Sequence, residues 1–524
     1  MLESPSRTHP KPLLEDIRES LSRSYADLPA RHVGHAPVSV GVFVLANTIL
    51  GAGMLGLPAA FAGCGYIAGV LGVLLFGGSA VLGLFLLSEA ANLVGRPATF
   101  HSVANAAVPG FGHAFDAAIA IKCFGVATSY LIVVKGNMPA AMIALGAPRD
   151  HWLTNKQLWV LLSAGLATPL AFLRSISRLR FTAVLSITCV ILIISVVLLF
   201  CAHPIPALDP CPTQSEVAAL GSPERNPSCG SPTLVPFTSP ISCLRELPIF
   251  VFSYTCHQNA ISVTNELRNP TSGRALLGMS TAVSIAMVAY LALAMGGYAT
   301  FGADVKGDVL ESYPSDSLVV GVARMAISLI VTLCYPLQCH PSRGCLTSIF
   351  VAVGEGLCSA TNQPASVTPI VPITMPLSST IDAHAASSGR GREDADEALR
   401  PDMRAGQVDV GAYEADSASA ARPLVDDHSA VPPFSLKAHI GITCAFLLSS
   451  IVIGLLVDDL GVVLRVVGAT GSTTVSYILP GGCYFVLART RARGSKRLRI
   501  AAAVMLLAGL VIMPLSLTLI FLPI

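Results

Sequence analysis

Two apolar segments hold residues that can bind a polar ligand without covalent chemistry. The first, VFVLANTILGAGMLGLPAAFAGCGY, clusters Gly51, Gly53 and Gly56 and places Pro58 shortly after them. Glycines in a membrane helix can simply allow close helix packing. A Gly-Ala-Gly run beside a proline favours a break instead. A break leaves backbone amide and carbonyl groups free to hold a ligand at membrane depth.

The second segment, PIFVFSYTCHQNAISVTNELRNP, is largely polar from Ser253 through Asn259. Polar side chains at this density are costly inside a bilayer. Interhelical hydrogen bonds around a buried His257 would also explain them. However, paired interrupted helices at the start of corresponding halves of a chain are typical of a midplane binding site.

No pattern in the sequence supports covalent chemistry. An intramembrane Asp pair, a metal-spaced His cluster and a nucleophile with its base are all missing from the sequence, so we do not expect an enzyme. The 14 cysteines include no CxxC pair. Cys211 and Cys229 lie in one polar loop and form a candidate disulfide if that loop faces an oxidising compartment.

Membrane helices must position these residues. The chain is 53% hydrophobic and only 12% charged, whereas soluble domains are about 25% charged. The net charge of +2 gives no basic excess for nucleic acid. Apolar segments long enough to cross a bilayer recur along the chain. We expect eleven, at 38–60, 66–94, 113–145, 157–174, 179–202, 243–266, 275–301, 316–340, 437–457, 461–488 and 499–522.

Loop charges set the expected orientation. Lys and Arg concentrate in every second loop, as at Arg174, Arg178 and Arg180, and such loops stay cytosolic. The amino-terminal tail 1–37 and the long loop 346–434 are polar and poor in large apolar residues, so we expect both to be disordered and cytosolic. The expected divisions are the tail 1–37, helices one to eight at 38–345, the loop 346–434 and helices nine to eleven at 435–524.

Four motifs, in this order, resemble the amino acid/auxin permease family, which includes sodium-coupled neutral amino acid transporters and fungal vacuolar amino acid transporters. They are NTILGAGMLGLP, FSYTCHQNAISVTNELRNPT, VTLCYPLQCHPSR and GATGSTTVSYILPGG. The resemblance implies an all-α polytopic membrane protein of eleven transmembrane helices. It also implies a five-plus-five inverted repeat with broken helices one and six, followed by a final helix.

The resemblance also implies site residues. In sodium-coupled members an Asn of helix one and a Thr of helix eight help to hold the cation, and they match Asn47 and Thr332. Such oxygen ligands suit a hard cation. Alternatively, Asn47 only bridges a broken helix and Thr332 bonds its own helix. The candidate substrate-binding residues are Thr48, Gly51, Ala52, Gly53, Phe252, Ser253, Thr255 and Asn259.

The coupling ion stays open between Na⁺ and H⁺. The CHQN wording of helix six is closer to the vacuolar branch than the CHPE of plasma-membrane members, which favours H⁺. His257 is then a candidate proton-sensing group, although a structural hydrogen-bonding role is favoured for it. Gly136 and Asn137 stand where relatives often carry Gly-Asp, and the missing acid weakens a proton relay there.

Charged residues also occur within the expected helices, Lys122, Lys135, Glu246 and Arg324 among them. Lys122 is expected to pair with Asp116 or to reach the membrane surface, whereas Lys135 has no evident partner. Glu246 and Arg324 are expected to form gates or static pairs.

Together these features predict a secondary active transporter. It would move small neutral amino acids with Na⁺ or H⁺ by alternating access, as a monomer, without an organic cofactor and without nucleic acid. The host membrane would be the plasma membrane or a vacuolar or lysosomal membrane, with membrane lipid as its surroundings. The alternative is an amino acid sensor with little flux, which would signal through the tail and the 355–433 part of the long loop.

Overall fold

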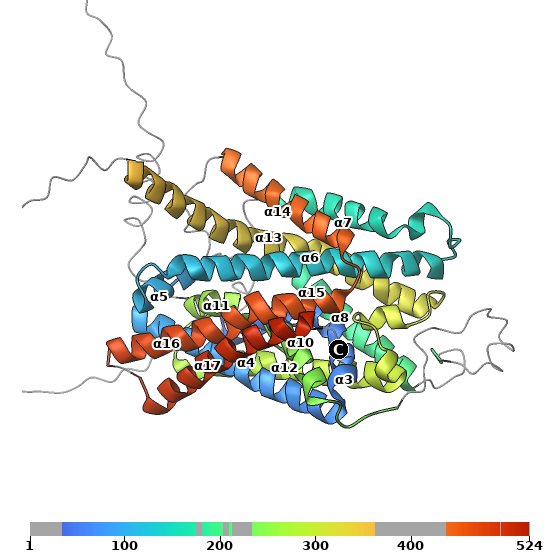
Figure 1. The fold of residues 1–524 in the computed structure, drawn as a ribbon, viewed down its shortest axis with the longest axis horizontal. Helices are drawn as coiled ribbons and strands as arrows, with labels where there is room; N and C mark the ends of the chain where they lie inside the picture. The colour runs from blue at the N-terminus through green and yellow to red at the C-terminus, as the bar shows by residue number, and fades with distance from the viewer. Residues whose placement is uncertain are drawn as a thin grey trace, which may run out of the picture. The chain divides into compact units, whose positions relative to one another are not determined.

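The computed structural model describes residues 34–173, 181–202, 209–211, 233–361, 436–492 and 494–522, except for the side chains of 181–183 and 354–361. This described part is helical, as Figure 1 shows, and its one β pairing is an isolated bridge between Ala36 and Leu267. The prediction of an all-helical polytopic membrane protein is therefore confirmed.

In chain order the elements are α2 (Val38–Ile49), the 3₁₀ turn η1 (Ala52–Gly56), α3 (Leu57–Cys64), α4 (Tyr66–Val94), α5 (Phe100–Ala107), α6 (Gly112–Ala144), η2 (Trp152–Thr154), α7 (Lys156–Ala171) and α8 (Phe181–Ala202). There follow α10 (Pro240–Ser253), η5 (His257–Asn259), α11 (Ala260–Glu266), α12 (Ser272–Phe301), η6 (Gly302–Asp304), η7 (Val309–Ser312) and α13 (Leu318–Thr361). The last are α14 (Leu436–Leu456), α15 (Leu460–Val467), the π-helical η8 (Gly468–Ser472) and η9 (Thr474–Ile478), α16 (Leu479–Thr490) and α17 (Lys496–Phe521).

Each of the eleven predicted segments falls on a helix or on a broken helix. By length and composition, 8 described helices can cross a membrane, or 9 if the bent pair Val38–Ile49 and Ala52–Cys64 is one span. The helix α7 has only 16 residues and α10 only 14, so neither counts as a span by itself. Eleven spans and an inverted repeat stay predictions.

Two helical features differ from the sequence expectation. The helix α5 was not predicted, because its 8 residues are too few for a membrane span. A capping box formed by Thr99 and Ser102 starts it. The helix α13 continues through Pro336 and Pro341 as far as Thr361, past the expected helix end at 340 and the expected boundary of the membrane part at 345. Most of the tail 1–37 and of the loop 346–434 lies outside the described residues.

The two predicted broken helices contact each other at one end. The backbone amide of Ala36 donates to the Glu266 carbonyl at 2.9 Å, and the Arg268 amide donates to the Ala36 carbonyl at 2.8 Å. Along their length, the helix α12 packs against α2, α3 and α4. The helix α10 packs against α3 and α15. The helix α12 thus lies against both halves of the first broken helix.

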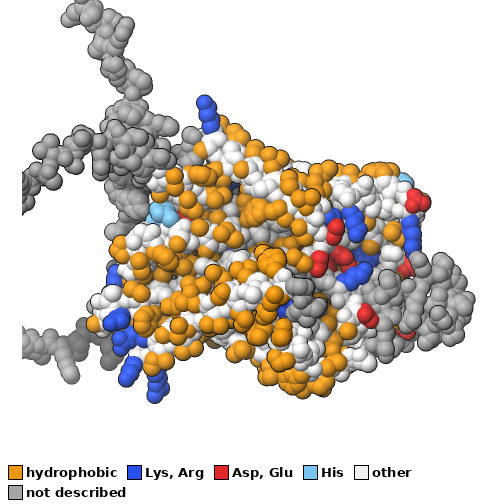
Figure 2. Space-filling view, viewed as in Figure 1, with side chains coloured by type: hydrophobic (Ala, Val, Ile, Leu, Met, Phe, Trp, Pro, Cys, Tyr) orange, Lys and Arg blue, Asp and Glu red, His pale blue; other side chains and the backbone are white. Residues whose placement is uncertain are grey.

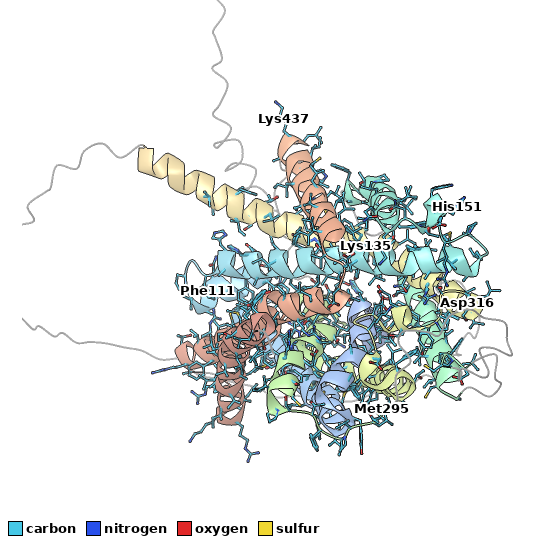
Figure 3. All side chains as sticks on the ribbon, turned by 45° about the vertical axis from the view of Figure 1, so that its right-hand side comes forward. Phe111, Lys135, His151, Met295, Asp316 and Lys437 are labelled. Atoms are coloured by element: carbon cyan, nitrogen blue, oxygen red, sulfur yellow. The ribbon has the colours of Figure 1, made fainter. Side chains whose placement is uncertain are left out.

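The surface is that of a protein surrounded by lipid. Large apolar side chains such as Leu75 (68% exposed) and Val288 (70% exposed) face outward, and hydrophobic atoms cover most of the face in Figure 2. Figure 3 shows Phe111 at one end of the helices and His151 and Asp316 at the other. The loops before and after α6 therefore lie at opposite ends, as a spanning helix requires.

Candidate functional site

The first broken helix is interrupted at Leu50 and Gly51. The helix α2 ends at Ile49, the helical segment Ala52–Cys64 begins two residues after Leu50, and the two axes are bent by 46°. Leu50 has φ −75° and ψ 73°, which is outside helical geometry. The break predicted from Gly51 and Gly53 is therefore confirmed. The first amide groups of the new helix have no partner within it.

The second broken helix is interrupted between Ser253 and Ala260. The helix α10 ends at Ser253, the short turn η5 follows at His257, and α11 begins at Ala260. The polar run of the sequence thus coincides with the break. This interruption is also confirmed.

The two breaks touch each other directly. The Ser253 hydroxyl lies 3.0 Å from the Gly53 carbonyl and 2.8 Å from the Ile249 carbonyl of its own helix, and it donates to one of them at a time. The Asn259 amide donates to the Thr48 hydroxyl at 2.8 Å. A Cβ atom added to Gly53 would lie only 3.0 Å from the Ser253 Cα atom. Glycine is therefore required at position 53 for the two chain segments to come this close.

Tyr290 of α12 bridges the same two breaks. Its hydroxyl oxygen lies 2.6 Å from the Ile49 carbonyl and 2.6 Å from the Ser253 carbonyl. Because a hydroxyl has one proton, it donates to one of these carbonyls at a time. The Tyr290 side chain is fully buried and packs edge-on against Tyr254. Sequence reasoning missed Tyr290, since nothing around it in α12 is polar enough to mark it.

Two other predicted residues of helix six, Thr255 and His257, lie against a third irregular helix. Thr255 donates to the Val251 carbonyl at 2.6 Å and accepts a hydrogen bond from Ser476 at 3.3 Å. Ser476 also lies 3.0 Å from Nδ1 of the fully buried His257. The phenyl ring of Phe252 lies against the backbone at Gly53.

This third irregular helix contains the two π-helical stretches η8 and η9. Ser476 belongs to η9, between α15 and α16. The sequence motif GATGSTTVSYILPGG covers both stretches, but its hydropathy predicts only a plain spanning helix. Such π-helical turns are frequent at functional sites. The site therefore extends to a part of the chain that sequence reasoning left out.

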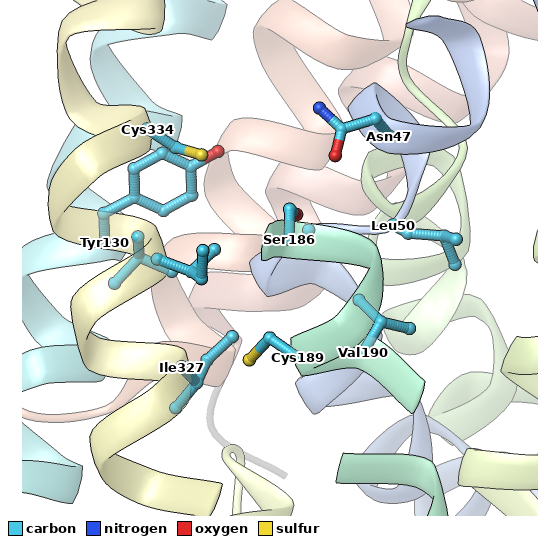
Figure 4. Close-up of a pocket in the computed structure, with 11 residues that line it drawn as sticks. Asn47, Leu50, Tyr130, Ser186, Cys189, Val190, Ile327 and Cys334 are labelled. Carbon is cyan, nitrogen blue, oxygen red and sulfur yellow. The ribbon is translucent and has the colours of Figure 1, made fainter. Parts of the chain in front are cut away.

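A narrow cavity opens beside the first break (Figure 4). The space open to the centre of a water molecule is about 20 Å³, roughly the room for one water. Asn47 lines it, and the Asn47 side-chain oxygen is buried without a hydrogen-bond partner among the described residues. The lining residues are Asn47, Leu50, Gly51, Tyr130, Ser186, Cys189, Val190, Ile327, Ile330, Val331 and Cys334.

Thr332 does not line this cavity. Its hydroxyl donates to the Ser328 carbonyl and lies 2.8 Å from the Ser163 hydroxyl of α7. Of the two residues predicted to hold the cation, Asn47 therefore has a side-chain oxygen without a hydrogen-bond partner among the described residues, whereas the Thr332 hydroxyl is hydrogen-bonded to Ser163 of α7. A cation held by both residues would require Thr332 to leave Ser163.

The buried charges are mostly static pairs or caps. Glu246 accepts two hydrogen bonds from Arg465, at 2.9 Å and 3.1 Å. The Arg324 guanidinium donates to the carbonyls of Leu310, Tyr313 and Pro314. Lys135 donates to three carbonyls near the end of α14 and pairs with Asp458 at 2.8 Å.

Lys122 lacks the partner expected from the sequence. It is 3% exposed, and no ion pair joins it to another described residue. Asp116 pairs instead with His101 at 3.2 Å. The prediction that Lys122 reaches the surface is wrong, since the side chain is buried, and the backbone of Lys122 lies close to Gly471 of η8.

The predicted disulfide is only half described. Cys211 is disulfide-bonded. Its predicted partner, Cys229, lies outside the described residues. The pairing of these two cysteines stays a prediction.

Comparison with known proteins identifies the family. The family model described as transmembrane amino acid transporter protein matches residues 36–522. Vacuolar amino acid transporter 6 of Saccharomyces cerevisiae is 32% identical over 85% of this chain and 89% of its own length. Vacuolar amino acid transporter 5 of Schizosaccharomyces pombe is 32% identical over 89% of this chain and 87% of its own length.

A mammalian relative covers less of the chain. Sodium-coupled neutral amino acid transporter 7 of Mus musculus is 29% identical over 56% of this chain and 61% of its own length. The family match extends from just before the first broken helix to the last helix, so it includes both breaks. The chain belongs to the transmembrane amino acid transporter family.

Proposed function

We propose that this protein is a secondary active transporter that moves small neutral amino acids by alternating access, coupled to Na⁺ or H⁺. The observation that carries this proposal is the meeting of two broken helices at Gly53 and Ser253. Unwound backbone at membrane depth is tolerated where it is buried in protein or lines a cavity. Two such breaks in contact supply polar groups that a ligand can use.

The substrate would bind as a zwitterion between the breaks. Its carboxylate would face the amide groups at Ala52 and Gly53, where the helical segment Ala52–Cys64 begins. Its ammonium group would face the carbonyl groups of Phe252 and Ser253 and the nearby hydroxyl of Thr255. Because the substrate carries both charges, no fixed charge is left unpaired when the site is empty.

The site must open before an amino acid can enter. The cavity at Gly51 has room for about one water, and Thr48 is tied to Asn259 across the breaks. Alternating access requires that such hydrogen bonds break on one side of the membrane at a time. The hydrogen bonds of Tyr290 would hold the two breaks together while the site changes from being open to one side of the membrane to being open to the other.

The observations that bear on the coupling ion point in opposite directions. The open oxygen of Asn47 suits Na⁺, and one relative is named as sodium-coupled. Thr332, however, is engaged with Ser163, and the two relatives aligned over most of this chain are named as vacuolar. We further propose a plasma, vacuolar or lysosomal membrane as the location, with the tail 1–37 and the loop 346–434 on the cytosolic side.

Uptake of radiolabelled neutral amino acids into proteoliposomes tests the proposal. If Na⁺ is coupled, replacing Na⁺ with choline at fixed pH abolishes accumulation. If H⁺ is coupled, accumulation persists in choline and follows an imposed pH gradient. A protein that binds label but accumulates none under either gradient would be a sensor, and the transport proposal would be wrong.

A further inference from the structure

Two acidic residues, the buried Asp308 and the half-buried Glu311, lie against α6 in the segment between α12 and α13. Asp308 is 3% exposed. One of its carboxyl oxygens accepts a hydrogen bond from the Asn137 amide at 2.7 Å, and the other accepts one from the Leu310 backbone amide at 2.9 Å. No ion pair joins Asp308 to another described residue. The carboxyl group is thus buried and accepts hydrogen bonds from two neutral donors.

Glu311 brings a second carboxyl group to the same place. Its Oε1 atom approaches α6 so closely that a Cβ atom added to Gly136 would lie 1.7 Å from it. Glu311 thus lies next to Asn137, the residue that donates to Asp308. Asp308 and Glu311 therefore both lie against the adjacent residues Asn137 and Gly136 of α6. Like charges that share a partly buried site oppose each other's ionisation.

The pair is short of hydrogen-bond donors. The side-chain oxygen of Asn137 is fully buried and has no donor among the described residues. A bound proton would add the missing donor to this cluster and remove one negative charge. Uncompensated buried polar groups are costly, so the cluster favours holding a proton.

The carboxyl pair is connected to the first broken helix. The turn η7, which contains Glu311, contacts both α6 and η1. A Cβ atom on Gly56 would lie 3.6 Å from the Gly307 carbonyl, and one on Gly297 would touch both Val309 and Pro58. Residues 305–312 therefore seat against α6 and the second half of broken helix one together. Loop charges predict this to be the extracytosolic end.

We propose that Asp308 and Glu311 form a proton-binding site that latches residues 305–312 over the extracytosolic end of broken helix one. The latch deepens the proposed transport function, on which its role as a gate rests. With a proton bound, the segment is seated; without it, repulsion between the two carboxylates loosens the segment and opens the outer path. The proton comes from water on that side and returns to it.

The surrounding charges alter the pKa values of the two acidic residues, but both values stay above those of ordinary carboxyl groups. Burial and, to a lesser degree, the nearby Glu311 charge raise the pKa of Asp308 to about 7, against the opposing effects of the hydrogen bonds from Asn137 and Leu310 and of the Arg324 charge. Burial likewise raises the pKa of Glu311. The other charged groups that face the pair are Arg324 of α13, Lys306, Lys156 at the start of α7 and Asp459 before α15.

Hydrogen–deuterium exchange of the full-length protein tests the latch, with rates corrected for intrinsic exchange. In the wild type we expect the amides of residues 302–317 to exchange at least about threefold faster at pH 8 than at pH 5.5. Asp308→Asn should remain protected at both pH values. The matched control is Asp316→Asn, which removes an acid from an exposed position of the same segment and should behave like the wild type.

Protection that does not change with pH in the wild type would overturn the latch, as would an Asp308→Asn variant that keeps the wild-type dependence. If Asp308→Asn does not fold, Glu311→Gln decides. It removes the neighbouring charge, so the midpoint of the pH dependence should move to lower pH, and an unmoved midpoint would contradict the inference. None of these results depends on flux, so absence of transport by the wild type would separately overturn the proposed function.

Discussion

The side-chain amide of Asn259 donates a hydrogen bond of 2.8 Å to the hydroxyl of Thr48, which joins the breaks of two helices that are far apart in the sequence. Thr48 in turn donates to the carbonyl of Val44 within its own helix. The hydroxyl of Thr48 therefore has a donor and an acceptor at once. This relationship links the geometry of one break to that of the other.

Removing this link should slow transport. A neutral hydrogen bond contributes about 0.5–1.5 kcal/mol, so we expect Asn259→Ala to reduce initial uptake several-fold, by up to about tenfold. Thr48→Ser keeps the hydroxyl and should stay near the wild type. In a double-mutant cycle, Thr48→Ala combined with Asn259→Ala should cost less than the sum of the two single changes. Additive losses would show that the two side chains act separately.

Tyr290→Phe should impair both stability and uptake. The change removes the hydroxyl that lies 2.6 Å from the carbonyls of Ile49 and Ser253 and leaves them without this donor. We expect a loss of about 1–3 kcal/mol, seen as a lower melting temperature in detergent. Tyr298→Phe is the matched control, because Tyr298 is equally buried on α12 but accepts from Val235 away from the breaks. It should leave uptake per folded molecule unchanged, and an equal loss of uptake in both variants would count against the bridge.

Lys135 is predicted to matter far more than its ion-pair partner. Lys135 is buried and caps the end of α14 through the carbonyls of Gly454, Leu455 and Val457, whereas the side chain of Asp458 is 74% exposed. Lys135→Met should therefore lower the free energy of unfolding by about 2–3 kcal/mol, and Asp458→Asn should change it little. Thermal unfolding of both variants measures this. Equal losses would mean that the ion pair, and not the helix cap, stabilises this end.

Stability should depend on pH through Asp308. Its pKa is raised from an ordinary 3.8 to about 7 in the folded chain, so the folded state binds more protons than the unfolded state between these values. The contribution of Asp308 is fully present below about pH 4 and is lost as the pH rises through 7. Asp308→Asn should therefore melt higher than the wild type at pH 8 but not at pH 4. A variant that melts lower than the wild type at pH 8 would contradict this sign.

The two breaks could be predicted because local residues cause them. Gly51 and Gly53 weaken a helix wherever they stand, and the polar run from Ser253 to Asn259 is unusual in any bilayer. These features are visible without knowing what packs around them. The positions of nearly all spanning helices follow from hydropathy for the same reason.

The missed parts of the site depend on contacts between distant residues. Tyr290 is one of many apolar-flanked tyrosines until α2 and α10 end beside it. Asp308 reads as an ordinary loop acid until Asn137 and Glu311 bury it. The π-helical turn at Ser476 likewise has no hydropathy signature. Burial and pairing of this kind are set by the tertiary fold, so a single sequence does not reveal them.

The central claim is that amino acids cross the membrane at the contact between Gly53 and Ser253. Its most direct test is the accumulation of radiolabelled L-alanine, L-leucine and L-glutamine by proteoliposomes containing the wild type, Gly53→Ala or Gly78→Ala. A Cβ atom at position 53 would lie 2.9 Å from the Phe252 ring and push the breaks apart, whereas one at position 78 would meet nothing within 4 Å. We predict accumulation by the wild type and by Gly78→Ala, and little or none by a folded Gly53→Ala. A wild type that accumulates none of the three amino acids, or a Gly53→Ala variant that accumulates as much as the wild type, would contradict the account.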